Sequence, residues 1–314
     1  MKTLIRFVGY LTIVLLLMLG CEKTTKNSNG NGNGDINCIY IADGGNNRII
    51  QMDDMTGSGW ETFGSEGNGV GEFIWSSDIA IGPDKKIYIV DSGNNRIVRI
   101  DDMNGAGWIT YGTEGNGVGE FNFSWDGSST VVGTDGKIYI VDNMNNRIVR
   151  INDMTGDGWI TYGNEGSGEG ELDWPTGIEI GIDNKIYIAD YCNDRIIKID
   201  NMIGQGWISF GFNSPTDVAV APNGKIYMIS EGGVIGCIDD MTGTGWLSYG
   251  EDEELFNEPC GIDIGADNKI YVLDSDNDRI VRIDDMTGSG WIDYGSGGSG
   301  EGEFYMPMGI VVIQ

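Results

Sequence analysis

The stretch DIAIGPDKKIYIVDSGNNRIVRIDDMNGAGWITYG, residues 78–112, contains the unit from which the chain is built. Short runs of β-branched and aromatic residues predict four strands, at 78–82, 86–91, 96–101 and 108–112. The segments between them, 83–85, 92–95 and 102–107, are rich in Pro, Gly, Asn and Asp, which favour tight turns. Four strands joined by such short turns predict one antiparallel sheet.

The same unit recurs six times along the chain. Its second strand carries the pattern Ile-Tyr-(Ile/Val/Met), with tyrosines at positions 40, 88, 139, 187, 227 and 271. The units are therefore about 47 residues long, which is the length of a propeller blade. A lone four-stranded sheet with two apolar faces is unstable, whereas six sheets around an axis bury both faces of each. We predict an all-β fold, a six-bladed β-propeller over residues 35–314.

The two ends of the repeated region complete one another. The first unit begins at its second strand, around Tyr40, with no first strand before it. Residues 307–314 have the sequence of a first strand with no second strand after it. We therefore expect the C-terminal strand to close the first blade, which also removes an open sheet edge.

The N-terminus has the features of an export signal. Lys2 and Arg6 precede an apolar run at 7–19, which is too short to span a bilayer. The sequence Met-Leu-Gly-Cys at 18–21 resembles the lipobox of bacterial lipoproteins, which implies cleavage after residue 20 and lipidation of Cys21. Residues 21–34 then form a polar, Asn- and Gly-rich flexible linker. We expect an exported protein held on the cell envelope by its lipid; a plain signal peptide is the alternative.

Composition excludes several classes of function. The net charge is −29, from 48 acidic and 19 basic residues, and such a surface repels nucleic acid. The chain contains no histidine, so neither a Ser-His-Asp mechanism nor a His-ligated metal centre can be built. The partners that fit this charge are proteins, basic peptides and glycans, with the membrane contacted only through the lipid anchor.

The repeats resemble NHL repeats across residues 35–314. The resemblance lies in Phe121, Leu172 or Phe304 ahead of Pro-x-Gly-Ile, then Ile-Tyr-Ile-Val-Asp and Asn-Asn-Arg-Ile. Members of this family serve as interaction platforms, sensor domains, RNA binders and occasionally lyases. The lyases depend on histidines and the RNA binders on basic faces, and this sequence lacks both. The resemblance therefore implies a non-catalytic binding scaffold, and we expect that the chain is not an enzyme.

An acidic residue and an arginine recur around the hairpin between the second and third strands. Each aspartate ends one strand and each arginine opens the next, so a charge-assisted ion pair is expected. Five copies indicate a structural role, since catalysis needs only one. The pairs are Asp43 with Arg48, Asp91 with Arg96, Asp142 with Arg147, Asp190 with Arg195, and Asp274 with Arg279.

Departures from the repeat indicate a candidate metal site. The middle position of the first strand is apolar in four units but is Glu179 and Asp263 in two others, and Asp217 begins its own first strand. If these side chains face the axis, they form an acidic channel. Gluconolactonase-like propellers bind calcium in that place, so a calcium-dependent lactonase-type hydrolase is the alternative function. Solvated acids in a water-filled channel are the simpler explanation, and no other cofactor is expected.

A second candidate site lies on one rim of the propeller. Trp75, Trp125 and Trp174 precede the first strands of three consecutive blades, outside the repeated tryptophan position, with Tyr305 on the adjoining blade. Together with Asp78 they form a candidate ligand face, because aromatic rings beside carboxylates suit a sugar or a cationic group. The alternative is that each tryptophan covers its own blade.

The remaining cysteines fall in different repeats with no Cys-x-x-Cys spacing. They are Cys38, Cys192, Cys237 and Cys260. We expect isolated, mostly buried thiols; a disulfide is compatible with an oxidising compartment but cannot be assigned from spacing. A closed propeller of this size is expected to be a monomer.

Substituting the lipidated cysteine tests the predicted anchor. We expect Cys21→Ser to abolish lipidation and to release the protein from the membrane fraction into solution. Fractionation of expressing cells, followed by mass spectrometry of the N-terminal peptide, measures both effects. Membrane association equal to that of the parent would contradict the lipoprotein assignment.

Overall fold

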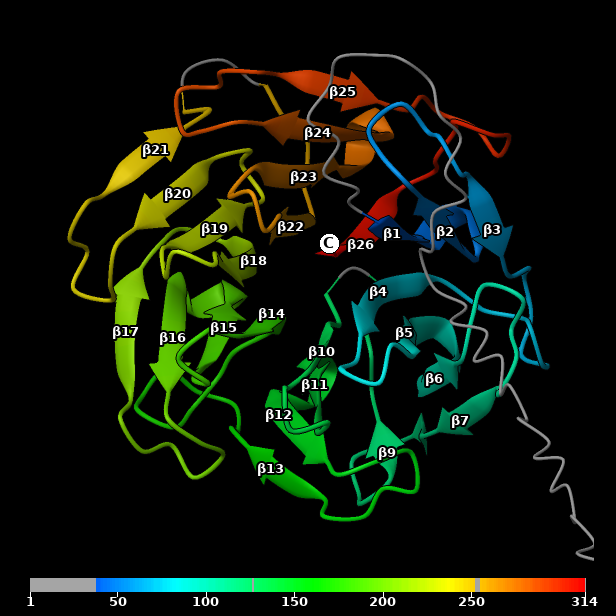
Figure 1. Ribbon diagram of the computed structural model, residues 1–314. Coiled ribbons are helices and arrows are strands. Elements are labelled where there is room, and N and C mark those ends of the chain that lie inside the picture. The colour runs from blue at the N-terminus through cyan, green and yellow to red at the C-terminus, as the bar shows by residue number, and fades with distance from the viewer. Residues whose placement is uncertain (1–37, 126, 252–254, 314) are drawn as a thin grey trace, which may run out of the picture.

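The computed structural model describes residues 38–125, 127–251 and 255–313. Within them, six four-stranded antiparallel sheets surround a central axis as the blades of a propeller, as predicted (Figure 1). No helix in these ranges is long and apolar enough to cross a membrane. The predicted signal peptide, the linker and Cys21 lie outside the described residues.

Within each blade, the strands lie side by side in order from the axis outward. Blade 1 contains β26 (Pro307–Ile313), β1 (Cys38–Asp43), β2 (Arg48–Met52) and β3 (Glu61–Phe63). Blade 2 contains β4 (Ser76–Ile81), β5 (Ile87–Asp91), β6 (Arg96–Ile100) and β7 (Ile109–Tyr111). Blade 3 contains β10 (Thr130–Val132), β11 (Ile138–Asp142), β12 (Arg147–Ile151) and β13 (Ile160–Tyr162).

The other three blades repeat this order. Blade 4 contains β14 (Pro175–Ile180), β15 (Ile186–Asp190), β16 (Arg195–Ile199) and β17 (Ile208–Gly211). Blade 5 contains β18 (Pro215–Val220), β19 (Ile226–Ser230), β20 (Ile235–Ile238) and β21 (Leu247–Tyr249). Blade 6 contains β22 (Gly261–Ile264), β23 (Ile270–Asp274), β24 (Arg279–Ile283) and β25 (Ile292–Tyr294).

Short elements connect these strands. A small parallel pair, β8 (Thr113–Glu114) and β9 (Glu120–Phe121), lies in the connector from blade 2 to blade 3. Five 3₁₀ turns join second and third strands: η1 (Gly44–Asn46), η2 (Ser92–Asn94), η3 (Asn143–Asn145), η4 (Tyr191–Asn193) and η5 (Ser275–Asn277). Each is followed by a left-handed residue such as Asn47, with φ 54°, a conformation that Asn and Asp tolerate better than other side chains.

The C-terminal strand closes blade 1, which confirms the prediction from the sequence. Antiparallel pairing joins β26 to β1 from Cys38 opposite Ile313 to Ile41 opposite Ile310. In Figure 1 the C-terminal strand β26 lies at the axis beside the N-terminal strand β1. The two ends of the propeller are therefore hydrogen-bonded into one sheet.

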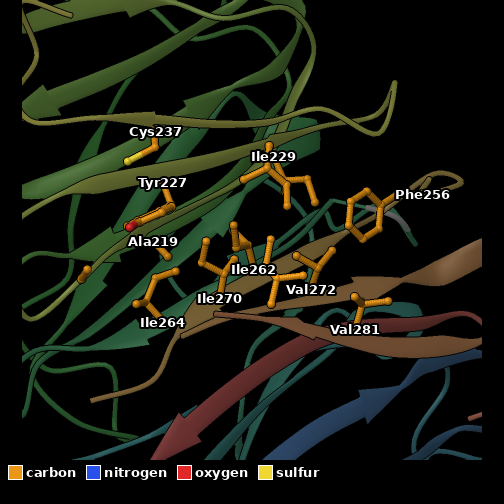
Figure 2. Close-up of a cluster of buried hydrophobic side chains, with 13 residues drawn as sticks. Ala219, Tyr227, Ile229, Cys237, Phe256, Ile262, Ile264, Ile270, Val272 and Val281 are labelled. Atoms are coloured by element: carbon orange, nitrogen blue, oxygen red, sulfur yellow. The ribbon is translucent and has the colours of Figure 1, made fainter. Parts of the chain in front are cut away.

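The core is divided among the interfaces between blades. The buried apolar side chains of the described residues form six clusters, and each contains residues of two adjacent blades. Figure 2 shows the cluster between blades 5 and 6, where Ile229 of β19 and Ile262 of β22 pack together. Stacking the sheets therefore removes both faces of every blade from water.

The repeated Asp and Arg side chains form ion pairs within the blades and hold the connectors. Asp142 is fully buried, and the Nε–H of Arg147 donates to its Oδ2 at 2.7 Å. The same guanidinium donates to the carbonyls of Asn116 and Glu120 in the connector that enters the blade. The equivalent Nε–Oδ2 distances are 2.7 Å at Asp43, Asp91 and Asp190, and 2.6 Å at Asp274.

A second polar link joins one blade to the next. The side-chain Oδ1 of Asn47 in blade 1 accepts the N–H of Trp75 in blade 2 at 2.7 Å. Asn95, Asn146, Asp194 and Asp278 accept the equivalent N–H of the following blade. The hairpin thus fixes its own connector through the arginine and the following blade through the adjacent Asn or Asp.

The repeated tryptophans fill the outer part of these interfaces. Trp108 of blade 2 packs against Phe63 of blade 1 and against Phe73, with ring centroids 6.2 and 5.5 Å apart. The guanidinium of Arg96 lies 5.7 Å from the Trp108 ring, a cation–π distance. The Asp91–Arg96 ion pair, Trp108 and Phe73 therefore form one packed unit at the outer edge of blade 2.

Blade 5 keeps the aromatic part of this unit, with Trp246 and Phe212 ring centroids 6.1 Å apart, but lacks the ion pair. Ser230 takes the place of the aspartate and no arginine follows, and the hairpin is closed instead by the Ser230 N–H donating to the Val234 carbonyl at 3.0 Å. Among the described cysteines, Cys237 is buried in this blade and Cys192 is exposed on η4, and both are free thiols. Cys38 is buried at the start of β1 and is disulfide-bonded, so the expectation of an isolated thiol is wrong for this residue.

Replacing one repeated arginine tests the importance of these pairs. We expect Arg147→Met to lower the free energy of unfolding by about 3 kcal/mol, because it leaves the buried Asp142 carboxylate without its cation. The matched control is Lys86→Met, which breaks the partly exposed pair with Asp101 and should cost less than about 1 kcal/mol. Urea unfolding at pH 7 measures both, and equal losses in the two variants would contradict the structural role.

Candidate functional site

The first strands of the blades line the axis and present two levels of side chains to it. At the second level each residue pairs with the repeated tyrosine of its blade, for example Glu179 with Tyr187 and Asp263 with Tyr271. The second level contains Ala80, Val131, Glu179, Ala219, Asp263 and Val311. The first level, two residues earlier along each strand, contains Asp78, Ser129, Gly177, Asp217, Gly261 and Gly309.

Three aspartates on these strands bind the backbone of the next blade. Asp78 Oδ2 accepts the N–H of Thr130 at 2.7 Å and the Ser129 hydroxyl at 2.8 Å. In the same way Asp217 Oδ2 accepts the N–H of Ile262 at 3.0 Å. Asp263 Oδ2 accepts the N–H of Val312 at 2.7 Å. These carboxyl groups therefore link the inner edges of neighbouring sheets.

Glycine in the preceding blade makes room for two of them. A Cβ atom at Gly309 would lie 2.2 Å from Asp78 Oδ1, and one at Gly177 would lie 2.4 Å from Asp217 Oδ1. No side chain fits at such distances, so the close approach requires glycine at both positions. Asp78 and Asp217, on opposite blades, thus occupy space that two neighbouring strands leave free.

The first level divides the channel into two spaces. The upper pit, of about 20 Å³, lies between hydroxyl side chains such as Ser77, Thr176 and Thr216. The lower cavity, of about 440 Å³, extends past Glu179 and Asp263 toward the opposite mouth. Asp78, Ser129 and Asp217 line both spaces.

The carboxyl groups of the channel stay protonated to a higher pH than ordinary Asp and Glu side chains. Burial raises the pKa of Asp78 to about 7 and that of Asp263 to about 6, against the hydrogen bonds that favour ionisation. Burial, with the neighbouring carboxylates, raises the pKa of Glu179 and Asp217 well above the usual range. Among the described residues that line the two spaces, none is a lysine or an arginine.

The predicted metal ligands share one cavity. Glu179, Asp217 and Asp263 all line the lower cavity. Within residues 38–125, 127–251 and 255–313, however, no three acidic or cysteine side chains are arranged to hold a metal ion. The oxygens of Asp217 and Asp263 accept backbone N–H groups, and the calcium site stays a prediction.

The predicted aromatic face is only partly brought together. Trp75 and Trp125 are paired on the rim, with ring centroids 5.8 Å apart and planes tilted by 31°, and Trp125 is 62% exposed. Trp75 and Trp174 occupy equivalent left-handed positions, with φ 56° and 53°. The equivalent residue of blade 3 is Phe123, whose N–H donates to Asn95.

The other two residues of the predicted ligand face, Trp125 and Tyr305, do not occupy the position of Trp75 and Trp174 in their blades. Trp125 lies in extra residues that only blade 3 has between its connector and its first strand. Tyr305 is 51% exposed and packs over Gly45, where a Cβ would lie 2.4 Å from the Tyr305 Cδ1 atom. It occupies the place that Ile74 takes over Gly93 in blade 2. The spacing from the connector Phe or Leu to the first level was the available signal, since Phe121 to Ser129 is longer than Phe73 to Asp78 and its counterparts.

Sequence reasoning missed the hydroxyl lining of the upper pit. The Ser77 hydroxyl donates to the Ser128 carbonyl at 2.9 Å, and the Thr216 hydroxyl donates to the Pro259 carbonyl at 2.8 Å. The Thr176 hydroxyl makes the equivalent bond to Pro215 at 2.9 Å. The recurring Ser or Thr immediately before the first level was the available signal.

Comparison with known proteins supports the fold. Residues 34–106 match a family described as a 6-bladed beta-propeller. No curated protein matches the sequence. Among solved structures, one from the nidogen/laminin complex is 16% identical, covers 88% of this chain and 98% of its own, and has a TM-score of 0.66. A Bacteroides caccae protein of unknown function is 12% identical, covers 89% of this chain and 99% of its own, with a TM-score of 0.61.

An enzyme is also among the similar structures. A streptogramin B lyase is 20% identical, covers 75% of this chain and 72% of its own, and has a TM-score of 0.54. The prediction that this chain is not an enzyme is therefore wrong as an inference from its fold, because an enzyme shares that fold. At this identity the likeness shows the fold alone. The chain is similar to six-bladed propellers, and the finer resemblance to NHL repeats stays a prediction.

The channel acids predict a dependence of stability on pH. A carboxyl group whose pKa is raised on folding destabilises the folded state once it ionises, so its penalty is absent below pH 4 and develops as pH rises. We expect Glu179→Gln to melt at a higher temperature than the parent at pH 8, by about 2–4 °C for each kcal/mol of relief, and at the same temperature near pH 4. Calorimetry measures both.

The matched control is Glu169→Gln, in an exposed connector. It should leave the melting temperature within a degree or so of the parent at both pH values, since surface substitutions usually change stability by less than about 0.5 kcal/mol. If Glu179→Gln melts at the same temperature as the parent at both pH 4 and pH 8, ionisation of Glu179 does not destabilise the folded state.

Proposed function

We propose that this propeller binds a basic segment of a peptide or protein on its Asn-Asn-Arg rim, with a lysine side chain entering the upper pit. The observation that carries the proposal is the exposed Trp125 ring paired with Trp75 beside that pit. Trp75 lies two residues before Ser77, and Trp125 lies two residues before Gly127, and both of these residues line the pit.

The chemistry of the pit favours an ammonium group. Its volume of about 20 Å³ has room for about one water-sized group, so it admits an ammonium but not a sugar ring. Asp78 and Asp217 lie at its base, and hydroxyl groups surround it. The methylene stem of a lysine can then lie against the tryptophan pair and cover its apolar surface.

Charge and fold are compatible with this role. A net charge of −29 attracts basic partners over a distance and raises their rate of association. The fold is shared with a protein of the nidogen/laminin complex, so it is suited to protein binding. Under the predicted lipidation of Cys21, the binding face would be held at the cell envelope.

Short peptides test the proposal. We expect the peptide Gly-Lys-Gly to bind the full-length chain at low salt and the peptide Gly-Gln-Gly to bind at least tenfold more weakly. Trp125→Ala should weaken binding of Gly-Lys-Gly at least fivefold, as measured by calorimetric titration. The matched control, Ile182→Ala, removes a similarly exposed side chain (67%) at the opposite mouth and should change nothing.

Three outcomes would contradict the proposal. Equal binding of the two peptides would remove the role of the ammonium group. Unchanged binding by Trp125→Ala would remove the aromatic face. Binding of oligosaccharides on a glycan array, with none of the lysine peptide, would assign the rim to a sugar ligand instead.

A further inference from the structure

The lower cavity is a separate space with its own mouth. It lies on the other side of the first level from the upper pit, and exposed residues of the opposite rim, Thr134, Ile182 and Pro222, line its outer end. Its volume of about 440 Å³ falls within the range of small-molecule sites. The proposed binding of peptides on the Asn-Asn-Arg rim leaves this cavity unused.

The walls of the lower cavity are mainly apolar. Ile81, Val132, Ile180, Val220 and Ile264 line it from five different blades. Four of these side chains are only partly buried, so their apolar surface is available to a ligand. An apolar wall with few polar groups is the usual composition of a site for a small organic molecule.

Glu179 differs from the other carboxyl groups of the cavity in what it binds. Asp78, Asp217 and Asp263 each accept an N–H from the next blade. Glu179 accepts the N–H of Ile180, the following residue of its own strand. Among the described residues, no donor from a neighbouring blade is found for it. Its carboxyl group therefore contributes nothing to joining the blades.

We propose that the lower cavity binds a small molecule with an apolar body and one primary amine, the ammonium group resting on Glu179. An ammonium supplies the donors that Glu179 lacks, and its positive charge favours the ionised carboxylate in a place with no lysine or arginine. A carboxylic acid would be repelled by the neighbouring aspartates. A neutral alcohol would donate one hydrogen bond without offsetting the charge.

The position of Glu179 suits this role. Val311 occupies the same level on blade 1, three blades away around the ring of six, and therefore lies across the channel from Glu179. Both residues line the cavity. An amine bound to Glu179 would direct its apolar body along the walls toward the open mouth. The second level thus provides one polar contact and an apolar environment around it.

Hexylamine is a suitable probe, with hexan-1-ol as its uncharged counterpart. We expect saturable binding of hexylamine to the full-length chain at pH 7.5 by calorimetric titration, and at least tenfold weaker binding of hexan-1-ol. Glu179→Gln, which keeps the size of the side chain, should weaken hexylamine binding at least tenfold. Val311→Phe should do the same by filling the cavity. Glu169→Gln is the control and should bind as the parent does.

The two proposed sites can be told apart. Trp125→Ala should leave hexylamine binding unchanged, whereas Glu179→Gln should leave the binding of Gly-Lys-Gly unchanged. The inference is overturned if hexylamine does not saturate, if hexan-1-ol binds equally well, or if Glu179→Gln and Val311→Phe both bind hexylamine as the parent does. Loss of hexylamine binding in Trp125→Ala would also overturn it, by assigning the amine to the upper rim.

Discussion

Each blade of this propeller depends on two neighbours, because its apolar faces are covered only by the sheets on either side. The buried side chains of the described residues are divided among six clusters at the blade interfaces. Such an arrangement has no uncovered end only if the ring closes. The pairing of β26 with β1 meets that requirement, since the sheet of blade 1 is made from both ends of the propeller.

Polar contacts fix the position of each blade relative to its connector and to the next blade. The arginine of each regular hairpin, such as Arg147, holds the connector that enters its blade, and the neighbouring Asn or Asp holds the next blade. Because the aspartate beneath the arginine is fully buried, the ion pair is sensitive to loss of either partner. Five blades share this arrangement, so its role is architectural. Blade 5, with Ser230 in place of the aspartate, relies on the apolar clusters and its neighbours.

The axis is where the blades stop being alike, and there the chemistry becomes specific. Asp78 and Asp217 fit because Gly309 and Gly177 leave space beside them. Those two carboxyl groups and that of Asp263 link neighbouring sheets. Glu179 makes no such link. Burial and three nearby carboxylates also oppose its ionisation, so the group is costly to place there. A costly group without a structural role is a reasonable place to look for a ligand.

The sequence by itself determined the all-β class, the number of blades, the closure by the C-terminal strand and the position of Glu179 and Asp263 at one level of the axis. These features follow from the alternation of side chains along each strand and from the repeat, which aligns equivalent residues of different blades directly in the sequence. Only the tertiary structure decided which blade each carboxyl group contacts, that Trp125 pairs with Trp75, and that the channel is divided at Asp78 and Asp217. Such features depend on the separation of neighbouring sheets and on the path of an inserted loop, which packing sets and residue spacing does not record.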